Sequence, residues 1–273
     1  MLFYGIILFM SKTILVAGKD LPSGMKLAEG LERTDRRVAV SAGINDNEND
    51  SEEVVSVNSE TIGIEWNRSS PVSSRTFVLE AESTMEQLDE AVLYFDETLF
   101  AQNSGQLNSE ECLRTSDSMV LCYQYLTMTL LERYEKKRSA ENPGTIVFLL
   151  RKSYDCADLN RNPSLRNGMN TFASPVVSAA AASFEAFAEN IASVYGDLDY
   201  LNIVLVKIEA DESDSDESVG QWLGEYNDAL YPSLKAMTKK SLQWLKPGSK
   251  AAKAAAKTAA SKPSKIGFWG RRH

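Results

Sequence analysis

The periodic stretch that begins at Ser174 predicts a helix that leads directly into a buried strand. Ser174 is a suitable helix N-cap, and Pro175 fits the first helical position, where its missing N–H is not needed. Apolar side chains then recur at three- and four-residue spacing, at Phe184, Phe187, Ile191 and Val194. Gly196 ends this pattern, and the apolar run over residues 201–206 predicts the strand.

The same reasoning divides the rest of the chain into strands and helices. Short apolar runs predict strands over 13–16, 37–41, 61–66, 75–79 and 144–150. Helical spacing predicts helices over 25–31, 83–95, 112–137, 222–230 and 233–245, and no seventh strand is visible. Strands that are apolar throughout are typical of parallel sheets. We therefore expect the fold class α/β, with a doubly wound parallel sheet in a Rossmann-like, three-layer α/β/α arrangement.

The composition changes this picture at the two ends of the chain. With 273 residues, 43% of them hydrophobic, the chain is long enough for one large core, which we place in residues 11–246. Residues 1–10 are apolar, but they are roughly half as long as a membrane span and lack the features of a signal peptide. They form a hydrophobic N-terminal arm, or Met10 is the true start of the protein and residues 1–9 are an upstream extension.

Residues 247–273 form a basic, Lys/Ala-rich tail that we expect to be flexible. The tail carries seven positive charges and no acidic residue, and the whole chain carries a net charge of −9, so the remainder carries −16. An acidic body is thus joined to a basic tail. Such a tail suits a nucleic acid, an anionic membrane or a protein partner, or it contacts the acidic loops of its own chain.

The titratable residues exclude several kinds of catalytic and metal site. The only histidine, His273, is the last residue, so Ser-His-Asp, Cys-His and histidine–metal chemistry are excluded, and we expect no metal. The three cysteines, Cys112, Cys122 and Cys156, have no CxxC spacing. We therefore expect reduced thiols and a cytoplasmic protein.

Two segments resemble the short-chain dehydrogenase/reductase family. The run Gly144-Thr-Ile-Val precedes the helix with Phe184-Glu-Ala-Phe, in the order typical of the second half of that family. Near the N-terminus, the family's T-G-x-x-x-G-x-G turn is matched by Gly18 and Gly24, between a predicted strand and a predicted helix. The resemblance covers roughly residues 12–208 and implies the Rossmann-like fold.

The resemblance also implies where catalytic residues would lie. The family uses a Tyr, a Lys four residues later and a Ser, and these positions correspond here to Val177, Ala181 and Arg151. Valine and alanine have no group that ionises, so they cannot transfer protons. The family's Asn has Ser116 or Asp117 as its nearest counterpart.

A different set of residues offers a substitute for the missing groups. Lys152, Ser153 and Tyr154 follow the predicted strand over 144–150, at the edge where such folds bind ligands. A relocated Tyr154–Lys152 pair is the sharpest catalytic hypothesis, and an ordinary polar loop is the alternative.

For the cofactor, the resemblance implies a site at the glycine turn. Gly18, Ser23 and Gly24 are the candidate cofactor-binding residues, but Pro22 replaces the middle glycine. The family's N-N-A-G at the end of its fourth strand corresponds to residues 80–83, where two carboxylates stand. We therefore expect no cofactor, with NAD(P) as the alternative.

These observations predict a degenerate dehydrogenase-like protein that acts as a binding or scaffold module. One alternative is a divergent NAD(P)-dependent oxidoreductase with relocated catalytic groups. Another is a nucleic-acid- or membrane-associated protein that acts through residues 247–273. Members of the family pair through two long helices, so the resemblance implies a homo-oligomer through residues 112–137 and 174–195.

Overall fold

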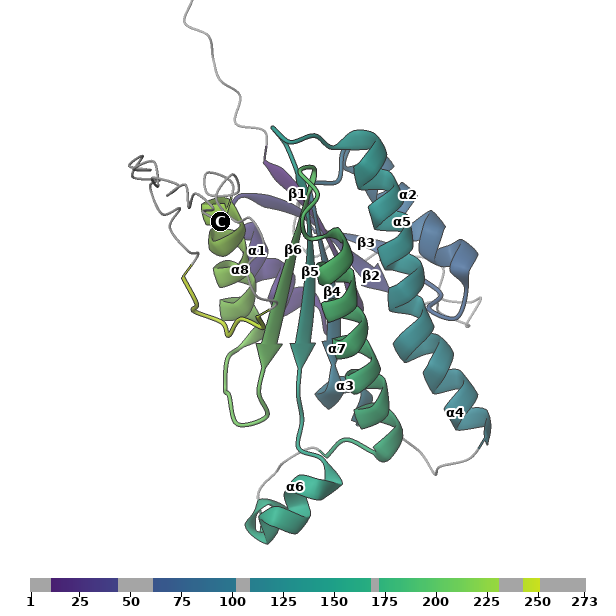
Figure 1. Cartoon of the computed structure of the whole chain (residues 1–273), viewed down its shortest axis with the longest axis vertical. Coiled ribbons are helices and arrows are strands. Elements are labelled where there is room, and N and C mark those ends of the chain that lie inside the picture. Colours follow the sequence, from purple (N-terminus) through teal and green to yellow (C-terminus); the bar gives the residue numbers. More distant parts are fainter. Residues whose placement is uncertain (1–10, 44–60, 102–108, 168–171, 231–242, 251–273) are drawn as a thin grey trace, which may run out of the picture.

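Six parallel strands form one sheet in the order β3-β2-β1-β4-β5-β6 (Figure 1). The computed structural model describes residues 11–43, 61–101, 109–167, 172–230 and 243–250. The predicted N-terminal arm, most of the basic tail and most of the helix predicted over 233–245 lie outside the described residues. Their predictions therefore stay predictions.

The strands alternate with helices along the chain. The strands are β1 (Lys12–Leu21), β2 (Arg36–Ala42), β3 (Thr61–Glu65), β4 (Glu90–Asp96), β5 (Gly144–Arg151) and β6 (Leu201–Ile208). The helices are α1 (Met25–Glu32), α2 (Pro71–Thr84), α3 (Glu97–Ala101), α4 (Ser109–Ser116), α5 (Cys122–Lys137), α6 (Cys156–Arg161), α7 (Pro175–Tyr195) and α8 (Asp216–Leu230). A π-helical turn, Asp117–Leu121, joins α4 to α5.

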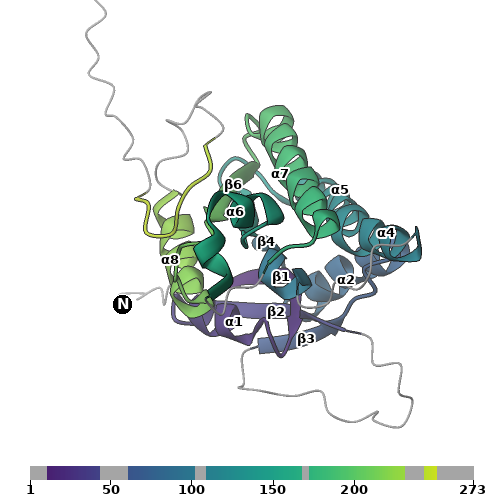
Figure 2. The ribbon, with the colours of Figure 1, turned by 90° about the horizontal axis from the view of Figure 1, so that it is seen from below.

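Helices cover both faces of the sheet and bury one apolar cluster on each side (Figure 2). On one face, α1 and α8 pack on the side chains of alternate strand residues such as Ile14, Val38 and Val92. On the other face, α2, α5 and α7 pack on the intervening residues, such as Leu15 and Leu93. The predicted three-layer, Rossmann-like α/β fold is confirmed. In the described ranges, no helix is both long and apolar enough to cross a bilayer.

The helix that the sequence predicts most strongly, α7, begins as expected. Ser174 caps it by accepting a hydrogen bond from the Val177 N–H at 3.3 Å, and Pro175 occupies the first turn. Phe184 and Ile191 are buried, whereas Val194 is 68% exposed. The buried stripe therefore ends at Ile191, one turn earlier than predicted.

The prediction of a strand over 75–79 is wrong, because this segment lies inside α2. The Ser70 side chain accepts a hydrogen bond from the Ser73 N–H, and Pro71 occupies the first helical position. The buried residues of this helix are Ser74, Phe77, Val78 and Ala81, which share one face at helical spacing. The cap and the proline set the conformation, and the apolar run only supplies the buried face.

The prediction of a helix over 83–95 is also wrong, because its second half forms β4. All residues from Glu90 to Asp96 are buried, since β4 lies between β1 and β5 in the middle of the sheet. An unbroken apolar run fits a helix face and a central strand equally well. Residues 80–83, where the counterpart of the family's N-N-A-G was expected, lie inside α2 and not at the end of a strand.

Three further boundaries differ from the predictions. Between residues 154 and 173, where no element was predicted, lie α6 and a short 3₁₀ turn, Pro163–Asn167. The last described helix, α8, begins at Asp216, before the predicted start at residue 222. Where a seventh strand would add to the sheet, Leu245 makes a parallel bridge to Val206, with backbone hydrogen bonds of 2.8 Å to the Leu205 C=O and 2.9 Å from the Lys207 N–H.

A buried ion pair joins β2 and β4 at the start of the sheet. The Arg36 Nε lies 2.8 Å from the Glu90 carboxylate, and both side chains are fully buried. Asp228 of α8 completes the guanidinium's contacts at 2.9 Å, and the Asn227 amide donates to Glu90 at 3.1 Å. Because a buried charge without its partner is strongly unfavourable, the fold depends on both members of this pair.

We predict that Glu90→Ala lowers the free energy of unfolding by about 3–5 kcal/mol, because Arg36 then lacks its buried partner. The measurement is urea unfolding followed by circular dichroism. The matched control is Glu132→Ala, which removes an exposed pair with Lys136 and is expected to change the same free energy by less than about 1 kcal/mol. Equal effects of the two substitutions would contradict the assignment.

Candidate functional site

The candidate site lies where the strand order reverses, at the carboxyl ends of β1 and β4. Doubly wound folds bind their ligands in the crevice outside this switch point. The residues that meet here come from the ends of β1, β4 and β5 and from the start of α8. Asp96 and Arg151 are direct neighbours in the sheet register.

The glycine turn is packed against the protein's own side chains. Gly18 has a φ of 107°, and a Cβ at this position would lie 2.1 Å from the Tyr94 carbonyl oxygen and 2.5 Å from the Tyr123 hydroxyl. Only glycine fits here, but the close neighbours are protein atoms. The same holds for Gly24, where a Cβ would lie 2.2 Å from the Lys19 carbonyl oxygen.

The backbone N–H groups of this turn already have acceptors within the chain. The Gly18 N–H donates to the Ser41 hydroxyl at 3.4 Å, and the Gly24 N–H donates to the Asp20 carbonyl at 3.1 Å. The Met25 N–H donates to the Pro22 carbonyl at 3.1 Å. Phosphate sites at helix N-termini use such N–H groups as donors to the ligand. Of the three candidate cofactor-binding residues, Gly18 and Gly24 are buried and Ser23 is exposed.

Lys19 is the central charge of the site. Its ammonium lies 2.6 Å from a carboxylate oxygen of Asp96 and 2.6 Å from one of Asp216, and all three side chains are largely buried. The ammonium also lies 5.0 Å from the centre of the Tyr94 ring. One cation thus bridges the end of β4 and the first residue of α8.

Arg151, which stands where the family's serine was expected, joins the same cluster. Its Nε donates to the Tyr94 hydroxyl at 2.8 Å, and one terminal nitrogen lies 2.9 Å from Asp216. The Tyr94 hydroxyl in turn donates to Asp216 at 2.7 Å. We call Lys19, Tyr94, Asp96, Arg151 and Asp216 the switch-point cluster; it contains two cations and two carboxylates.

Burial and charge set the proton affinities in the switch-point cluster. Burial, reinforced by the carboxylates of Asp96 and Asp216, raises the pKa of Tyr94 well above its ordinary value. Burial alone would raise the pKa of Asp216, but Lys19, Tyr94 and Arg151 outweigh burial and lower this pKa. Near neutral pH the phenol is therefore protonated and the carboxylate ionised, which is the arrangement that the hydrogen bonds require.

A second ion pair fills the other side of the glycine turn. Arg68 lies 2.9 Å from the Asp20 carboxylate and donates to the Gly18 carbonyl, also at 2.9 Å. Its guanidinium carbon lies 5.2 Å from the centre of the Trp66 ring and 5.5 Å from that of Phe100. The largely buried guanidinium of Arg68 thus neutralises Asp20, two residues after Gly18.

Of the candidate catalytic residues, Lys152 and Ser153 share Glu97 as a partner, whereas Tyr154 contacts Phe172. The Lys152 ammonium lies 2.9 Å from Glu97, and the Ser153 N–H donates to the other oxygen of that carboxylate at 2.7 Å. The Tyr154 ring packs against Phe172 with 6.3 Å between ring centres. Burial raises the pKa of Glu97 despite the opposing effects of Lys152 and of the Ser153 N–H.

The positions that correspond to the family's Tyr and Lys are part of the apolar core. Val177 is 1% exposed and Ala181 is fully buried, and both belong to the cluster beneath α7. Ser116 donates to the Cys112 carbonyl at 2.9 Å within α4. Within the ranges that the structure describes, no group of acidic, cysteine or histidine side chains could hold a metal ion.

Sequence reasoning did not single out Lys19, Tyr94, Asp96 or Asp216. A signal was present in part, because Lys19 and Asp20 directly follow an apolar run, as Asp96 and Glu97 do at the end of β4. Charged side chains at that point of a parallel strand reach the ligand-binding edge of the sheet. The mistaken assignment of β4 hid this signal for Tyr94 and Asp96.

Comparisons with known proteins support the fold. No family model matches the chain, and no curated protein matches its sequence. Among solved structures, it is similar to a short-chain dehydrogenase from Mycobacterium smegmatis (TM-score 0.54, 12% identity, 78% of this chain and 84% of the other). It is also similar to apo LigO from Sphingobium sp. strain SYK-6 (TM-score 0.55, 14% identity, 81% and 79%).

A third similar structure contains a nucleotide. It is the RhlG/NADP active-site complex of Pseudomonas aeruginosa (TM-score 0.50, 16% identity, 72% of each chain). At such identities these likenesses concern the fold alone. The chain thus has a Rossmann-like fold similar to that of short-chain dehydrogenases.

We predict that Asp216→Asn makes stability less sensitive to acid. The pKa of Asp216 is lowered in the folded state, so its contribution is present above the ordinary value of 3.8 and is lost as the pH falls through that value and below. Between about pH 5 and pH 3 the natural protein should therefore lose more unfolding free energy than the variant does. Urea unfolding at each pH measures this.

The control for this prediction is Glu217→Gln, at the next position, where the carboxylate pairs with Arg33 outside the switch-point cluster. This variant should keep the acid dependence of the natural protein. If Asp216→Asn also kept it, the ion pairs of Asp216 would not act as described.

Proposed function

We propose that this protein is a non-catalytic binding or scaffold module with a dehydrogenase-like fold. The proposal rests on the switch-point cluster, in which the charged side chains at the ligand-binding edge form ion pairs with one another. Lys19 pairs with Asp96 and Asp216, and Arg151 pairs with Asp216. Breaking these buried pairs to admit a ligand would leave charges without partners, which is strongly unfavourable.

The charge at this edge also disfavours the pyrophosphate of a dinucleotide. Carboxylates of Asp20, Asp96 and Asp216 lie around the glycine turn. Their cationic partners balance them but leave no excess of positive charge to attract a phosphate. The N–H groups of Gly18 and Gly24, which could otherwise donate to a phosphate, already have acceptors.

The proton chemistry supports the same conclusion. Val177 and Ala181 have no ionisable group and are buried. The only phenol in the switch-point cluster, Tyr94, has a raised pKa, so it gives up its proton less readily than an ordinary tyrosine. A catalytic tyrosine needs the opposite shift to act as an acid or base near neutral pH.

A second candidate function is a divergent NAD(P)-dependent oxidoreductase, and one observation favours it. Glu97 is a buried carboxyl group with a raised pKa at the carboxyl end of β4, next to Lys152 and Ser153. Buried carboxyls with raised pKa values recur among general acids and bases. Here, Glu97 and Lys152 would be the relocated proton-transfer groups.

We predict that neither NADH nor NADPH binds the full chain saturably up to about 1 mM, the upper end of usual Michaelis constants. The reason is that the charged groups at the carboxyl edge are already paired with one another and do not bind the pyrophosphate. Fluorescence titration with each nucleotide measures the binding. A dissociation constant in the micromolar range would contradict the proposal and favour the second candidate. In that case Glu97→Gln should lower turnover at least about 100-fold, and the exposed control Lys26→Gln should not.

The partner that we propose for the module is a second copy of the chain, bound through α5 and α7. These helices lie side by side on one face of the sheet (Figures 1 and 2). Met128 of α5 is 57% exposed, and Ala182 and Ala186 on the outer side of α7 are exposed as well. Small residues allow two helices to approach closely, and an exposed methionine adapts to the facing surface.

We predict that the full chain sediments as a dimer in analytical ultracentrifugation. Met128→Glu should convert it to a monomer, because a charge would be buried between the facing helices. The control is Val72→Glu on α2, at an apolar side chain that is 73% exposed and lies outside the two helices. A monomeric natural protein, or equal effects of both variants, would overturn this interface.

A further inference from the structure

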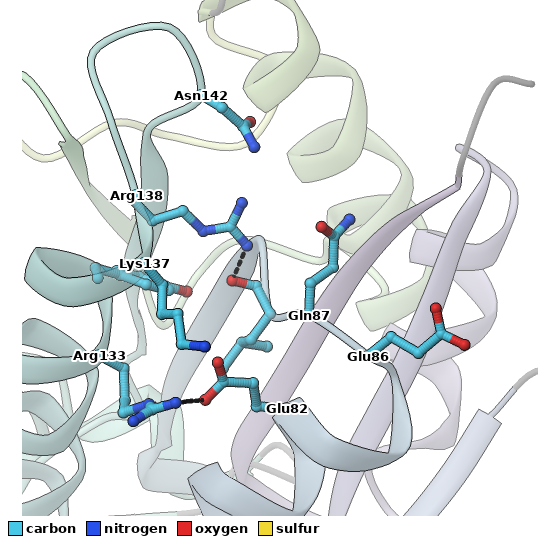
Figure 3. A pocket seen from close by; sticks show the side chains of 9 residues that line it. Glu82, Glu86, Gln87, Arg133, Lys137, Arg138 and Asn142 are labelled. Carbon is cyan, nitrogen blue, oxygen red and sulfur yellow. Dashed lines mark hydrogen bonds and ion pairs between the residues drawn. The ribbon is translucent and has the colours of Figure 1, made fainter. Parts of the chain in front are cut away.

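A cavity lies at the opposite edge of the sheet, near the amino ends of β4 and β5 (Figure 3). Its volume is about 240 Å³. The last turn of α5 lines it with Arg133, Lys137 and Arg138. The turn between α2 and β4 and the turn between α5 and β5 complete the wall, so three separate segments build the cavity.

Most of the charges in the wall are paired. Arg133 Nε donates to the Glu82 carboxylate at 2.7 Å, and one terminal nitrogen of Arg138 lies 2.9 Å from Asp89. Arg138 also donates to the Leu88 carbonyl, as Figure 3 shows. These pairs fix the wall and neutralise Arg133 and one side of Arg138.

Two cationic donors of the wall are left over. The side chain of Arg138 is 5% exposed, and its buried Nε has no hydrogen-bond partner within the described part of the chain. The Lys137 ammonium likewise makes no hydrogen bond or ion pair to any residue that the structure describes. A buried N–H without an acceptor is unfavourable, so a bound group that supplies an acceptor would be stabilised here.

Amides provide further hydrogen-bonding groups around the same space. Figure 3 shows the side chains of Asn142 and Gln87 on either side of the space that Arg138 enters. Glu86 leads away from that space in this view, and Glu82 is held by Arg133. The groups that face the cavity are thus cationic or neutral, and the acids are paired or directed outward.

We propose that this cavity binds a small metabolite through an oxyanion, either a phosphate or a carboxylate. Lys137 and the Arg138 Nε–H bind the oxyanion, and the Asn142 amide and the Gln87 amide oxygen bind polar groups of the attached body. The Gln87 amide nitrogen already donates to Asp89 at 3.2 Å. Cations that donate to such oxyanions form the stronger class of hydrogen bonds. The volume is below the roughly 300–1,000 Å³ of sites for drug-sized ligands, which excludes a dinucleotide.

This proposal is independent of the proposed function, because the cavity and the switch-point cluster lie at opposite edges of the sheet. The position of the cations at the end of α5 also suits the helix dipole, which favours positive charge there. The dipole explains why Lys136 and Lys137 stand in the last turn, but it provides no acceptor for the buried Arg138 Nε.

The test is isothermal titration calorimetry of the full chain at constant ionic strength. The three probes are inorganic phosphate, glycerol 3-phosphate and succinate, which separate a free oxyanion, a phosphate ester and a carboxylate. At least one probe should bind the natural protein saturably. Lys137→Gln should weaken that binding about tenfold or more, because it removes a charged donor.

The matched control is Lys136→Gln, which removes the same charge one residue earlier, where the lysine pairs with Glu132 and does not line the cavity. This variant should bind like the natural protein. Circular dichroism checks that both variants keep the fold. The absence of binding by all three probes, or equal loss in the two variants, would overturn the proposal.

Discussion

The ion pairs of Lys19 are the constraint on which the ligand-binding edge of this fold depends. Asp96 ends β4 and Asp216 begins α8, and only the ammonium of Lys19 lies 2.6 Å from both carboxylates. Two buried acids so close together need a cation between them, since an unpaired buried charge is far more costly than a paired one. The pairing helps to hold α8 against the sheet, and burial together with the two carboxylates keeps Tyr94 protonated.

The same pairing limits the chemistry of the edge. A group that transfers protons near neutral pH must hold its proton loosely enough to release it. The pKa values of Tyr94 and Asp216 are shifted in opposite directions. The phenol keeps its proton more strongly than usual, and the carboxyl group loses its proton more readily. Glu97, the residue after Asp96, differs from Asp216, because burial raises its pKa despite its contact with Lys152. The charged side chains of this edge are thus held in pairs, and the pair of Glu97 with Lys152 contains a carboxyl group whose pKa is raised.

How far the sequence predicts this structure depends on which signal a segment carries. Local caps were sufficient for α7, where Ser174 and Pro175 start the helix. The same signal stands before α2, but the apolar run after Arg75 outweighed it in the prediction. In β4 every residue is buried, so its pattern has no period by which to distinguish a strand from a helix. Local patterns therefore predict the order of most elements and fail where a central strand and a capped helix compete.

The candidate site was harder to predict, because its contacts connect distant parts of the chain. Lys19 and Asp216 are 197 positions apart, and no spacing within one segment could have paired them. The pair can be recognised only from the topology, which brings the end of β1 beside the start of α8. The cavity at the other edge has the same origin: Arg138 lies near Leu88 because α5 ends beside the turn into β4.

Binding capacity in a folded protein resides in polar groups that the fold itself leaves without partners. At the carboxyl edge the switch-point cluster satisfies Lys19 and Arg151 from within the chain. Two guanidinium nitrogens are buried without an acceptor in the described part of the chain: one terminal nitrogen of Arg68, beside the glycine turn, and the Nε of Arg138, at the amino edge. Under the two proposals, this dehydrogenase-like fold binds a ligand at the amino edge of the sheet and not at the carboxyl edge.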